Sequence, residues 1–504
     1  MVTTLKEVFL MKKIGFDNNK YLSMQSEQIR KRIADFGGKL YLEFGGKIFD
    51  DFHASRVLPG FEPDSKIRML QQLKDDAEIV ITINSADIEN NKIRGDLGIS
   101  YEDDVLRLID IFGEMGLYVG SVVLTRYMGQ AAVDAFLKRL TALGVRCYCH
   151  YPIAGYPSDV QHIVSDEGLG KNDYIETTHS LVVLTAPGPG SGKMATCLSQ
   201  LYHDYKRGIK SGYAKFETFP IWNLPLKHPV NLAYEAATAD LNDLNMIDPF
   251  HLEAYGETAV NYNRDVEIFP VLNTIFQRIQ GSSPYKSPTD MGVNMVGNCI
   301  VDDDVCCEAS KMEILRRYYN ACCERLSGKD DGNQVTKLEI LMNQAGITSD
   351  IFPAIDAALR KAQDTGAPAG ALLLPDGRVV TGKTSDTLGA ASALILNALK
   401  EFGGIDDSLD LIAAEVLEPI CELKTNYLKH RNPRLHTDEV LIALTISALT
   451  NPIAKLAMDQ LGNLNGCEAH FSVIIGDEDK KLLKRLGINV SCEPHYENKR
   501  LFHK

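Results

Sequence analysis

The amino-acid sequence predicts an α/β protein whose N-terminal part is a doubly wound, mainly parallel sheet. Over residues 1–225, short apolar runs of strand length alternate with amphipathic stretches of helix length. Strands of a parallel sheet are buried on both faces, so they appear as nearly continuous apolar runs. One such run leads directly into a glycine-rich turn and then a helix, the arrangement found at the ligand-binding edge of doubly wound sheets. The last 150 residues return to the same alternation and predict a further α/β domain.

Five runs carry the expectation of the N-terminal sheet, and three amphipathic stretches predict helices between them. The strand-like runs are 39–43, 78–84, 118–124, 145–149 and 180–185, and the helical stretches are 65–76, 103–114 and 130–143. Right-handed crossovers would place these helices on both faces, with ligands at the carboxyl ends of the strands. We therefore define residues 1–225 as a Rossmann-like domain.

The pattern changes from about residue 226, where no convincing strand alternation is found. Residues 233–244 and 311–326 predict helices, and a turn-rich stretch, 281–288, lies between them. Asp248 and Pro249 are typical of a helix start, with the carboxylate as N-cap and proline in the first turn. The alternative, a metal site of Asp248, His251 and Glu253, is less favoured. Residues 226–350 are thus expected to form a mainly helical domain.

Residues 351–504 predict a C-terminal α/β domain that begins with a hairpin over 369–381. Helices are expected at 387–400, 438–450 and 477–486, with a strand at 471–475 and Gly487 as a helix C-cap. The order resembles the cytidine-deaminase layout, but the HxE and PCxxC zinc signature of that family is absent. The domain is therefore expected to serve binding or assembly, without zinc.

Composition and charge exclude several classes of protein. The 504 residues contain 53 Lys and Arg against 67 Asp and Glu, a net charge of −14. An acidic surface argues against nucleic-acid or membrane partners. No run of 18 uncharged apolar residues and no signal-peptide core are present. The 11 cysteines include no CxxC pair, which indicates free thiols in a reducing compartment. We expect a cytoplasmic protein without a metal site.

The glycine-rich turn is the most informative motif. Thr185-Ala-Pro-Gly-Pro-Gly-Ser-Gly-Lys193 joins an apolar run to a helix. Backbone N–H groups of such a loop favour an anion, and a lysine adds charge beside it. The predicted phosphate-binding residues are Gly188, Gly190, Ser191, Gly192 and Lys193. The alternative is a tight strand-to-helix turn without a ligand.

The loop departs from the standard phosphate-binding pattern in two ways. Pro187 stands where a first glycine is expected, and Met194 replaces the hydroxyl that normally binds Mg²⁺. Residues 377–384 match the full GxxxxGK[ST] pattern, yet they cover the return strand of the predicted hairpin. A strand between the glycines cannot cradle a phosphate, so this match is interpreted as accidental.

Further polar residues follow other predicted strands and are candidates for the same cleft. Gly45, Gly46 and Lys47 follow the first strand, Arg56 comes shortly after, and His150 follows the fourth. The alternatives are a surface turn for the glycines and a hydrogen-bonded structural role for the histidine.

Seven strings together resemble a bacterial family known as the domain of unknown function 1846 family. They are Leu40-Tyr-Leu-Glu-Phe-Gly-Gly-Lys47, Arg56-Val-Leu-Pro-Gly-Phe-Glu-Pro63, Thr185-Ala-Pro-Gly-Pro-Gly-Ser-Gly-Lys193, Tyr213-Ala-Lys-Phe-Glu-Thr-Phe-Pro220, Trp222-Asn-Leu-Pro-Leu226, Asn261-Tyr-Asn-Arg-Asp265 and Asn432-Pro-Arg-Leu-His436. The resemblance covers the chain from about Met11 and leaves residues 1–10 as an extra leader or an alternative start. It implies a bacterial cytoplasmic protein of several packed domains and carries over no catalytic residue. Members have sometimes been labelled ATP-dependent peptidases, but no HExxH or GxSxG motif supports that activity here.

These observations predict a protein that binds a nucleotide such as ATP, or another small phosphorylated molecule. The ligand would lie on the 188–193 loop, and Arg264 from the helical segment could close the cleft. Whether the protein is an enzyme stays open, and the alternative is a non-enzymatic ligand sensor or assembly protein. The apolar helices 388–399 and 440–449 predict burial on more than one side and hence a homo-oligomer.

Overall fold

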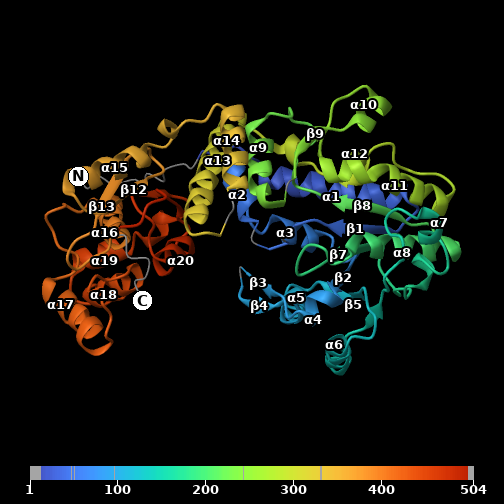
Figure 1. The fold of residues 1–504 in the computed structure, drawn as a ribbon, viewed down its shortest axis with the longest axis horizontal. Helices are drawn as coiled ribbons and strands as arrows, with labels where there is room; N and C mark the ends of the chain where they lie inside the picture. Colours follow the sequence, from blue (N-terminus) through green and yellow to red (C-terminus); the bar gives the residue numbers. More distant parts are fainter. Residues whose placement is uncertain are drawn as a thin grey trace, which may run out of the picture. The chain divides into compact units, whose positions relative to one another are not determined.

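The computed structural model describes residues 13–46, 48–49, 51–95, 97–241, 243–329 and 332–497. They form two compact units, Ile14–Ser310 and the described residues from Lys311 onward (Figure 1). The boundary falls within helix α13 (Asp303–Leu326). Residues 1–10 and Lys47 lie outside the described part of the chain. The sequence predicted boundaries near 225 and 350, whereas residues 226–310 cluster with the N-terminal sheet.

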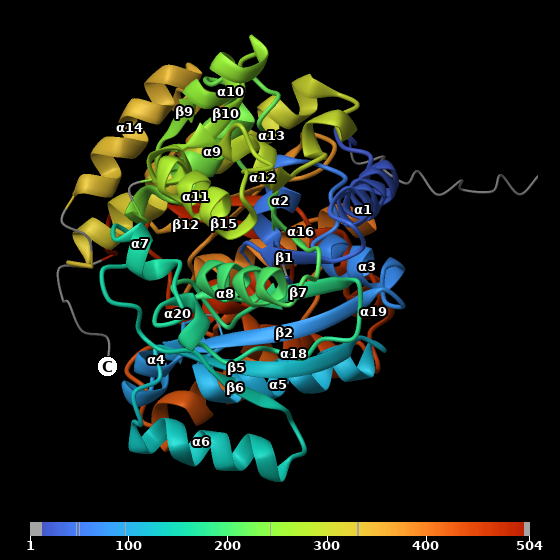
Figure 2. The same cartoon turned by 90° about the vertical axis from the view of Figure 1, so that its right-hand side faces the viewer.

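A seven-stranded parallel sheet forms the centre of the N-terminal unit and confirms the predicted α/β class. Its order is β11 (Gly292–Val293), β8 (Gly212–Phe216), β1 (Leu40–Phe44), β7 (Leu181–Thr185), β2 (Ala77–Asn84), β5 (Tyr118–Thr125) and β6 (Cys147–Cys149). Figure 2 shows the strands from β1 to β6 in this succession. Every residue of β2 and β7 is buried, so both faces of the sheet are covered.

Helices surround this sheet in the pattern of a doubly wound fold. They are α1 (Asn18–Asp35), α2 (Phe52–Val57), α3 (Ser65–Gln72), α4 (Ser85–Glu89), α5 (Tyr101–Glu114), α6 (Ala131–Ala142), α7 (Val160–Ile163), α8 (Lys193–Lys206), α9 (Pro229–Ala237), α10 (Pro249–Tyr255), α11 (Asn263–Gln280) and α12 (Pro288–Met291). On one face, α8 and α11 pack against alternate side chains of β1, β7 and β2 to form a hydrophobic core. Two short antiparallel pairs, β3 (Ile93–Arg94) with β4 (Ile99–Ser100) and β9 (Asn245–Ile247) with β10 (Val260–Tyr262), lie outside this sheet.

The order of the strands creates a topological switch point between β1 and β7. The chain leaves β1 toward β2, on the far side of β7, and it leaves β7 through α8 toward β8, on the far side of β1. Right-handed crossovers in opposite directions run over opposite faces of the sheet. The loops after β1 and β7 therefore diverge at the carboxyl edge, the usual ligand position in open α/β sheets.

The sequence missed two strands of this sheet. β8 contains the charged residue Lys215, and β11 has only two residues, so neither gives a clear apolar run. β11 comes from the segment that was expected to lack strands. The expected helix start at Asp248 is confirmed, because its carboxylate accepts hydrogen bonds from the N–H groups of Phe250 and His251 at the start of α10.

The C-terminal unit is an α/β domain around a mixed four-stranded sheet of order β13 (Val379–Lys383), β12 (Ala369–Leu373), β14 (Glu468–Phe471) and β15 (Asn489–Cys492). β12 is antiparallel to both neighbours, and β14 and β15 are parallel. The helices of this unit are α14 (Asn333–Ala345), α15 (Pro353–Thr365), α16 (Ala390–Gly403), α17 (Ala414–Glu422), α18 (Thr437–Ser447), α19 (Pro452–Met458) and α20 (Asp477–Arg485). The hairpin is confirmed, and β13 occupies most of the second phosphate-loop match. The strand expected at 471–475 was placed too late in the sequence, because β14 spans Glu468–Phe471.

None of the helices in the described ranges combines the length and the apolar character needed to cross a lipid bilayer.

Candidate functional site

The glycine-rich loop follows β7 and ends at the first turn of α8, as the sequence predicted. Gly190 and Gly192 have φ angles of +73° and +86°, in the left-handed region that disfavours side chains. Gly192 is the N-cap of α8 and provides no side-chain cap for the first turn. The loop thus places backbone N–H donors at the positive end of a helix.

Side chains from β2 and β5 hold the loop in place. The hydroxyl of Thr125 donates to the carbonyl of Ser191 at 2.8 Å, and the amide of Asn84 donates to the carbonyl of Gly190 at 3.3 Å. The hydroxyls of Thr82 and Ser191 are 3.1 Å apart. The carbonyl side of the loop is therefore bonded to the sheet.

The N–H side of the loop has no such partners. Among the described residues, no acceptor is found for the N–H groups of Gly188, Gly190, Gly192 or Lys193, whereas the turn at Pro189 and Gly190 directs the N–H of Ser191 toward the carbonyl of Gly188. The half-buried ammonium group of Lys193 also makes no hydrogen bond or ion pair within the described ranges. Unsatisfied donors and a cation at one helix start are the elements of an anion site.

A buried group of charged side chains lies at the same edge of the sheet, around Lys215 on β8. Its ammonium group is 2.9 Å from Glu217 and also contacts the carboxylate of Asp265 and the hydroxyl of Tyr262. On β1, the carboxylate of Glu43 accepts a hydrogen bond of 2.8 Å from a tyrosine of β8. We call Glu43, Lys215, Glu217, Tyr262 and Asp265 the lysine–carboxylate cluster.

Burial and charge shift the pKa values in this cluster. Burial raises the pKa of Glu217 to about 7, and Asp265 and Glu43 raise it while Lys215 opposes the rise. Burial by itself would lower the pKa of Lys215, but Asp265 and Glu217 outweigh it and hold that pKa well above its ordinary value. Glu217 therefore exchanges a proton near neutral pH beside a permanently charged lysine.

A second buried lysine, on α3, lies near the same edge of the sheet. The ammonium group of Lys66 is 2.8 Å from Asp51 and 6.0 Å from the ring centre of Phe216, the last residue of β8. Burial opposes ionisation of Asp51, but Lys66 outweighs it and lowers the pKa of the carboxyl group. A side-chain atom on Gly46 would lie 3.6 Å from this ammonium group, so Lys66 lies next to the loop after β1.

The Cys197 thiol on α8 is influenced by one charge from the glycine-rich loop and by one from the lysine–carboxylate cluster. Burial raises the pKa of the Cys197 thiol on α8, the Glu43 carboxylate raises it further, and Lys193 lowers it. Both charges therefore act on one thiol in the second turn of the helix. This edge of the sheet therefore carries both a loop with unbonded N–H groups and a buried carboxyl group whose pKa burial raises to about 7.

The structure places some of the predicted residues at this edge of the sheet and holds others in structural contacts away from it. Gly45 and Gly46 follow β1, and the N–H of Gly45 donates at 3.3 Å to the carbonyl of Phe216 at the end of β8. Arg56 lies in the last turn of α2. His150 is buried, with Nε2 3.1 Å from the carbonyl of Asp173, and burial lowers its pKa to about 4.

Arg264 is held by a carboxylate instead of projecting freely into the cleft. Its guanidinium group forms two short contacts, 2.6 and 2.7 Å, with the carboxylate of Asp243. Its chain neighbour, Asp265, is the residue that reaches Lys215. Sequence reasoning missed the lysine–carboxylate cluster and Lys66, although a lysine and a glutamate two apart in Tyr213-Ala-Lys-Phe-Glu217 were a usable signal. Charges on one face of a buried strand require partners.

Comparison with known proteins places the whole chain in one family. The family model described as "Domain of unknown function DUF1846, N-terminal" matches residues 14–346, and the corresponding C-terminal model matches residues 350–502. The chain is 58% identical over 494 residues to UPF0371 proteins of Streptococcus pyogenes serotype M5 and of Streptococcus uberis, covering 98% of this chain and 100% of each relative. The printed names of these bacterial relatives state no activity. The chain therefore belongs to the DUF1846 family, as the sequence strings predicted.

Proposed function

We propose that the N-terminal unit binds a small phosphorylated molecule, a nucleotide such as ATP or a phosphometabolite, at the carboxyl edge of its sheet. The observation that carries this proposal is the set of N–H donors without acceptors at Gly188, Gly190, Gly192 and Lys193. The phosphate would accept these hydrogen bonds, and the ammonium group of Lys193 would neutralise its charge. The switch point between β1 and β7 supports the same position.

The proposed binding mode does not use a magnesium ion held by the loop. Met194 stands at the position of the usual hydroxyl ligand. The hydroxyl of Ser191 is bonded to Thr82, and that of Thr196 is buried 3.4 Å from His150. Both nearby hydroxyls are thus engaged within the protein. Backbone donors and lysine side chains would provide the charge compensation instead.

The lysine–carboxylate cluster favours an enzyme over a passive binder. A carboxyl group with a pKa of about 7, as burial gives Glu217, can act as a general acid or base at neutral pH. Lys215 beside it could stabilise negative charge that develops on a substrate. A ligand-sensing protein needs neither property.

A thermal-shift screen of the full chain against nucleotides and sugar phosphates tests the proposal. A ligand at 100 times its dissociation constant stabilises the folded unit by about 2.7 kcal/mol. In Lys193→Ala, the affinity for any ligand found should fall by about 1.5–3 kcal/mol, the range of a charge-assisted hydrogen bond. Lys138→Ala on α6, which removes an exposed lysine from another part of the unit, is the matched control. Equal affinity in both variants would reject the assignment of the loop.

An assembly role is the second candidate function, and the exposed surface of α18 favours it. The helix buries Val440 and Leu444 on one side, but Ile442, Ile446 and Leu449 just beyond its end are 62%, 55% and 81% exposed. Apolar side chains in such a row are typical of a surface that another protein covers. A second copy of the chain would form a homo-oligomer. Light scattering at micromolar concentration tests this role, and a monodisperse monomer would exclude it.

A further inference from the structure

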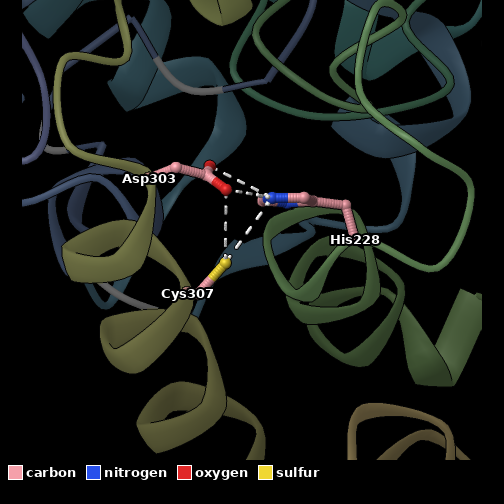
Figure 3. Close-up of side chains that lie close together, drawn as sticks. All are labelled: His228, Asp303 and Cys307. Atoms are coloured by element: carbon pink, nitrogen blue, oxygen red, sulfur yellow. Dashed lines mark hydrogen bonds and ion pairs between the residues drawn. The ribbon is translucent and has the colours of Figure 1, made fainter.

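A histidine, a carboxylate and a thiol meet within the N-terminal unit, away from the glycine-rich loop in sequence (Figure 3). His228 is the N-cap of α9, and Asp303 and Cys307 lie one helical turn apart on α13. Nε2 of His228 is 3.1 and 3.2 Å from the two carboxylate oxygens of Asp303. Sγ of Cys307 is 3.5 Å from the same nitrogen and 3.8 Å from Oδ2.

We propose that His228, Asp303 and Cys307 form a binding site for a divalent transition-metal ion, with Zn²⁺ as the best fit. Zinc bonds of about 2.3 Å to sulfur and about 2.0 Å to nitrogen and oxygen, at tetrahedral angles, separate the ligand atoms by about 3.3–3.6 Å. The separations in the chain, 3.1–3.8 Å, bracket these values. The three atoms therefore need to move by only a few tenths of an ångström to surround an ion.

The chemistry of the donors selects the kind of ion. A thiolate and an imidazole suit Zn²⁺ and related transition metals, whereas Mg²⁺ and Ca²⁺ prefer sites built from oxygen alone. Within the residues that the structure describes, no fourth histidine, cysteine or acidic residue joins this group. Three protein ligands leave one position for water, which is typical of catalytic or exchangeable zinc rather than of closed structural sites.

Regular elements fix the ligands before any ion binds. Asp303 and Cys307 are four residues apart, so they project from the same face of α13. The ring of His228 is held because its Nδ1 accepts from the N–H of Val230 at 3.3 Å. The His228 side chain is only 9% exposed, whereas that of Asp303 is 57% exposed. The carboxylate thus gives an ion access from solvent to a histidine that is otherwise buried.

Metal binding requires two proton movements, of which the one on His228 breaks the Nδ1 contact that holds its ring in the metal-free chain. In the metal-free chain, Nδ1 of His228 accepts a hydrogen bond, so Nε2 carries the proton and donates to Asp303. An ion replaces this proton, which moves to Nδ1 as the long 3.3 Å contact with Val230 opens. The thiol of Cys307 releases its proton to solvent, since thiolate is the ligand form. No oxidation or reduction is involved.

The three residues escaped sequence analysis because they do not form a recognisable motif. His228 and Asp303 are 75 positions apart. A pair of ligands four apart on one helix is common, and only the fold brings the histidine to it.

Cobalt titration of the full-length, metal-free protein tests the site directly. Co²⁺ substitutes for Zn²⁺ and gives a sulfur-to-cobalt charge-transfer band and intense visible bands when it is bound tetrahedrally to a thiolate. We expect one cobalt ion per chain with these bands, and their loss when Zn²⁺ is added. Absence of the bands would overturn the proposal and leave an ordinary hydrogen-bonded trio.

Variants identify the ligands. Cys307→Ser should remove the charge-transfer band. Asp303→Asn should weaken cobalt binding by more than about 100-fold, a larger loss than is typical for residues that only hydrogen-bond to a metal ligand. Asp304→Asn is the matched control, because this exposed neighbour projects from a different side of α13. Circular dichroism of the metal-free variants checks that each one folds. A band that survives in Cys307→Ser, or equal binding in the two aspartate variants, would refute the three-ligand site.

Discussion

Replacing Glu217 by glutamine should change how the stability of the N-terminal unit depends on pH. Burial raises the pKa of this carboxyl group to about 7. One pKa unit corresponds to about 1.4 kcal/mol. With an ordinary value of 4.5, the folded unit therefore prefers the protonated form of Glu217 by about 3–4 kcal/mol relative to the unfolded chain.

The direction of the effect follows from the raised pKa. Because the folded state holds the proton more tightly than the unfolded state, this contribution is fully present below about pH 4.5. It is lost as the pH rises through 7. Glutamine resembles the protonated carboxyl group at every pH. The free energy of unfolding of Glu217→Gln, relative to the parent chain, should therefore rise by about 3 kcal/mol between pH 4.5 and pH 8.

Urea unfolding followed by tryptophan fluorescence measures this difference in the right unit. The chain has a single tryptophan, Trp222, whose indole N–H donates to the carbonyl of Asn294 at 3.0 Å within the N-terminal unit. Glu253→Gln, which changes an exposed carboxylate on α10, is the control and should show the pH dependence of the parent. If Glu217→Gln also follows the parent at every pH, the burial argument for this carboxyl group is refuted.

Three further perturbations have expected outcomes. Gly188→Ala should destabilise the unit by about 1–3 kcal/mol in urea unfolding, because its new methyl group would overlap the hydroxyl of Tyr101; unchanged stability would contradict the packing of the loop. Arg316→Met should destabilise the C-terminal unit by about 3–5 kcal/mol, because it leaves the buried carboxylate of Glu468 without the guanidinium group 2.8 Å away. Calorimetry measures this change as a lower unfolding temperature, and an unchanged unfolding temperature would show that the pair is dispensable. Ile446→Asp should shift the chain toward monomer in light scattering if a second copy covers α18, and an unchanged mass would count against that interface.

The parts of the fold that the sequence predicted are those with a local signal. The runs 78–84 and 180–185 have consecutive apolar residues at 79–81 and 181–184, as burial of both faces in a parallel sheet requires. The hairpin turn at Pro375–Gly377 and the N-cap at Asp248 are likewise set by neighbouring residues. β8 was missed because Lys215 interrupts its apolar run, and that lysine is neutralised by the nearby Glu217 and by the distant Asp265.

The candidate site likewise has one part with a local sequence signal and other parts without one. The glycine-rich loop is contiguous, so its residue pattern predicts the backbone donors. The pairing of Lys215 with Asp265, 50 positions later, depends on how α11 packs beside β8, and no local pattern contains that information. The same is true of His228 and the helix that carries Asp303.

The hydrogen bonds from Asn84 and Thr125 to the carbonyl side of the glycine-rich loop have a consequence for binding kinetics and entropy. Fixing one residue of a free chain costs about 1–2 kcal/mol of conformational entropy at room temperature. In this loop that freedom is already lost when the sheet forms, so an arriving anion does not have to order the backbone. Affinity can then reflect the contacts themselves, and association should proceed in a single step without a slow rearrangement of the loop.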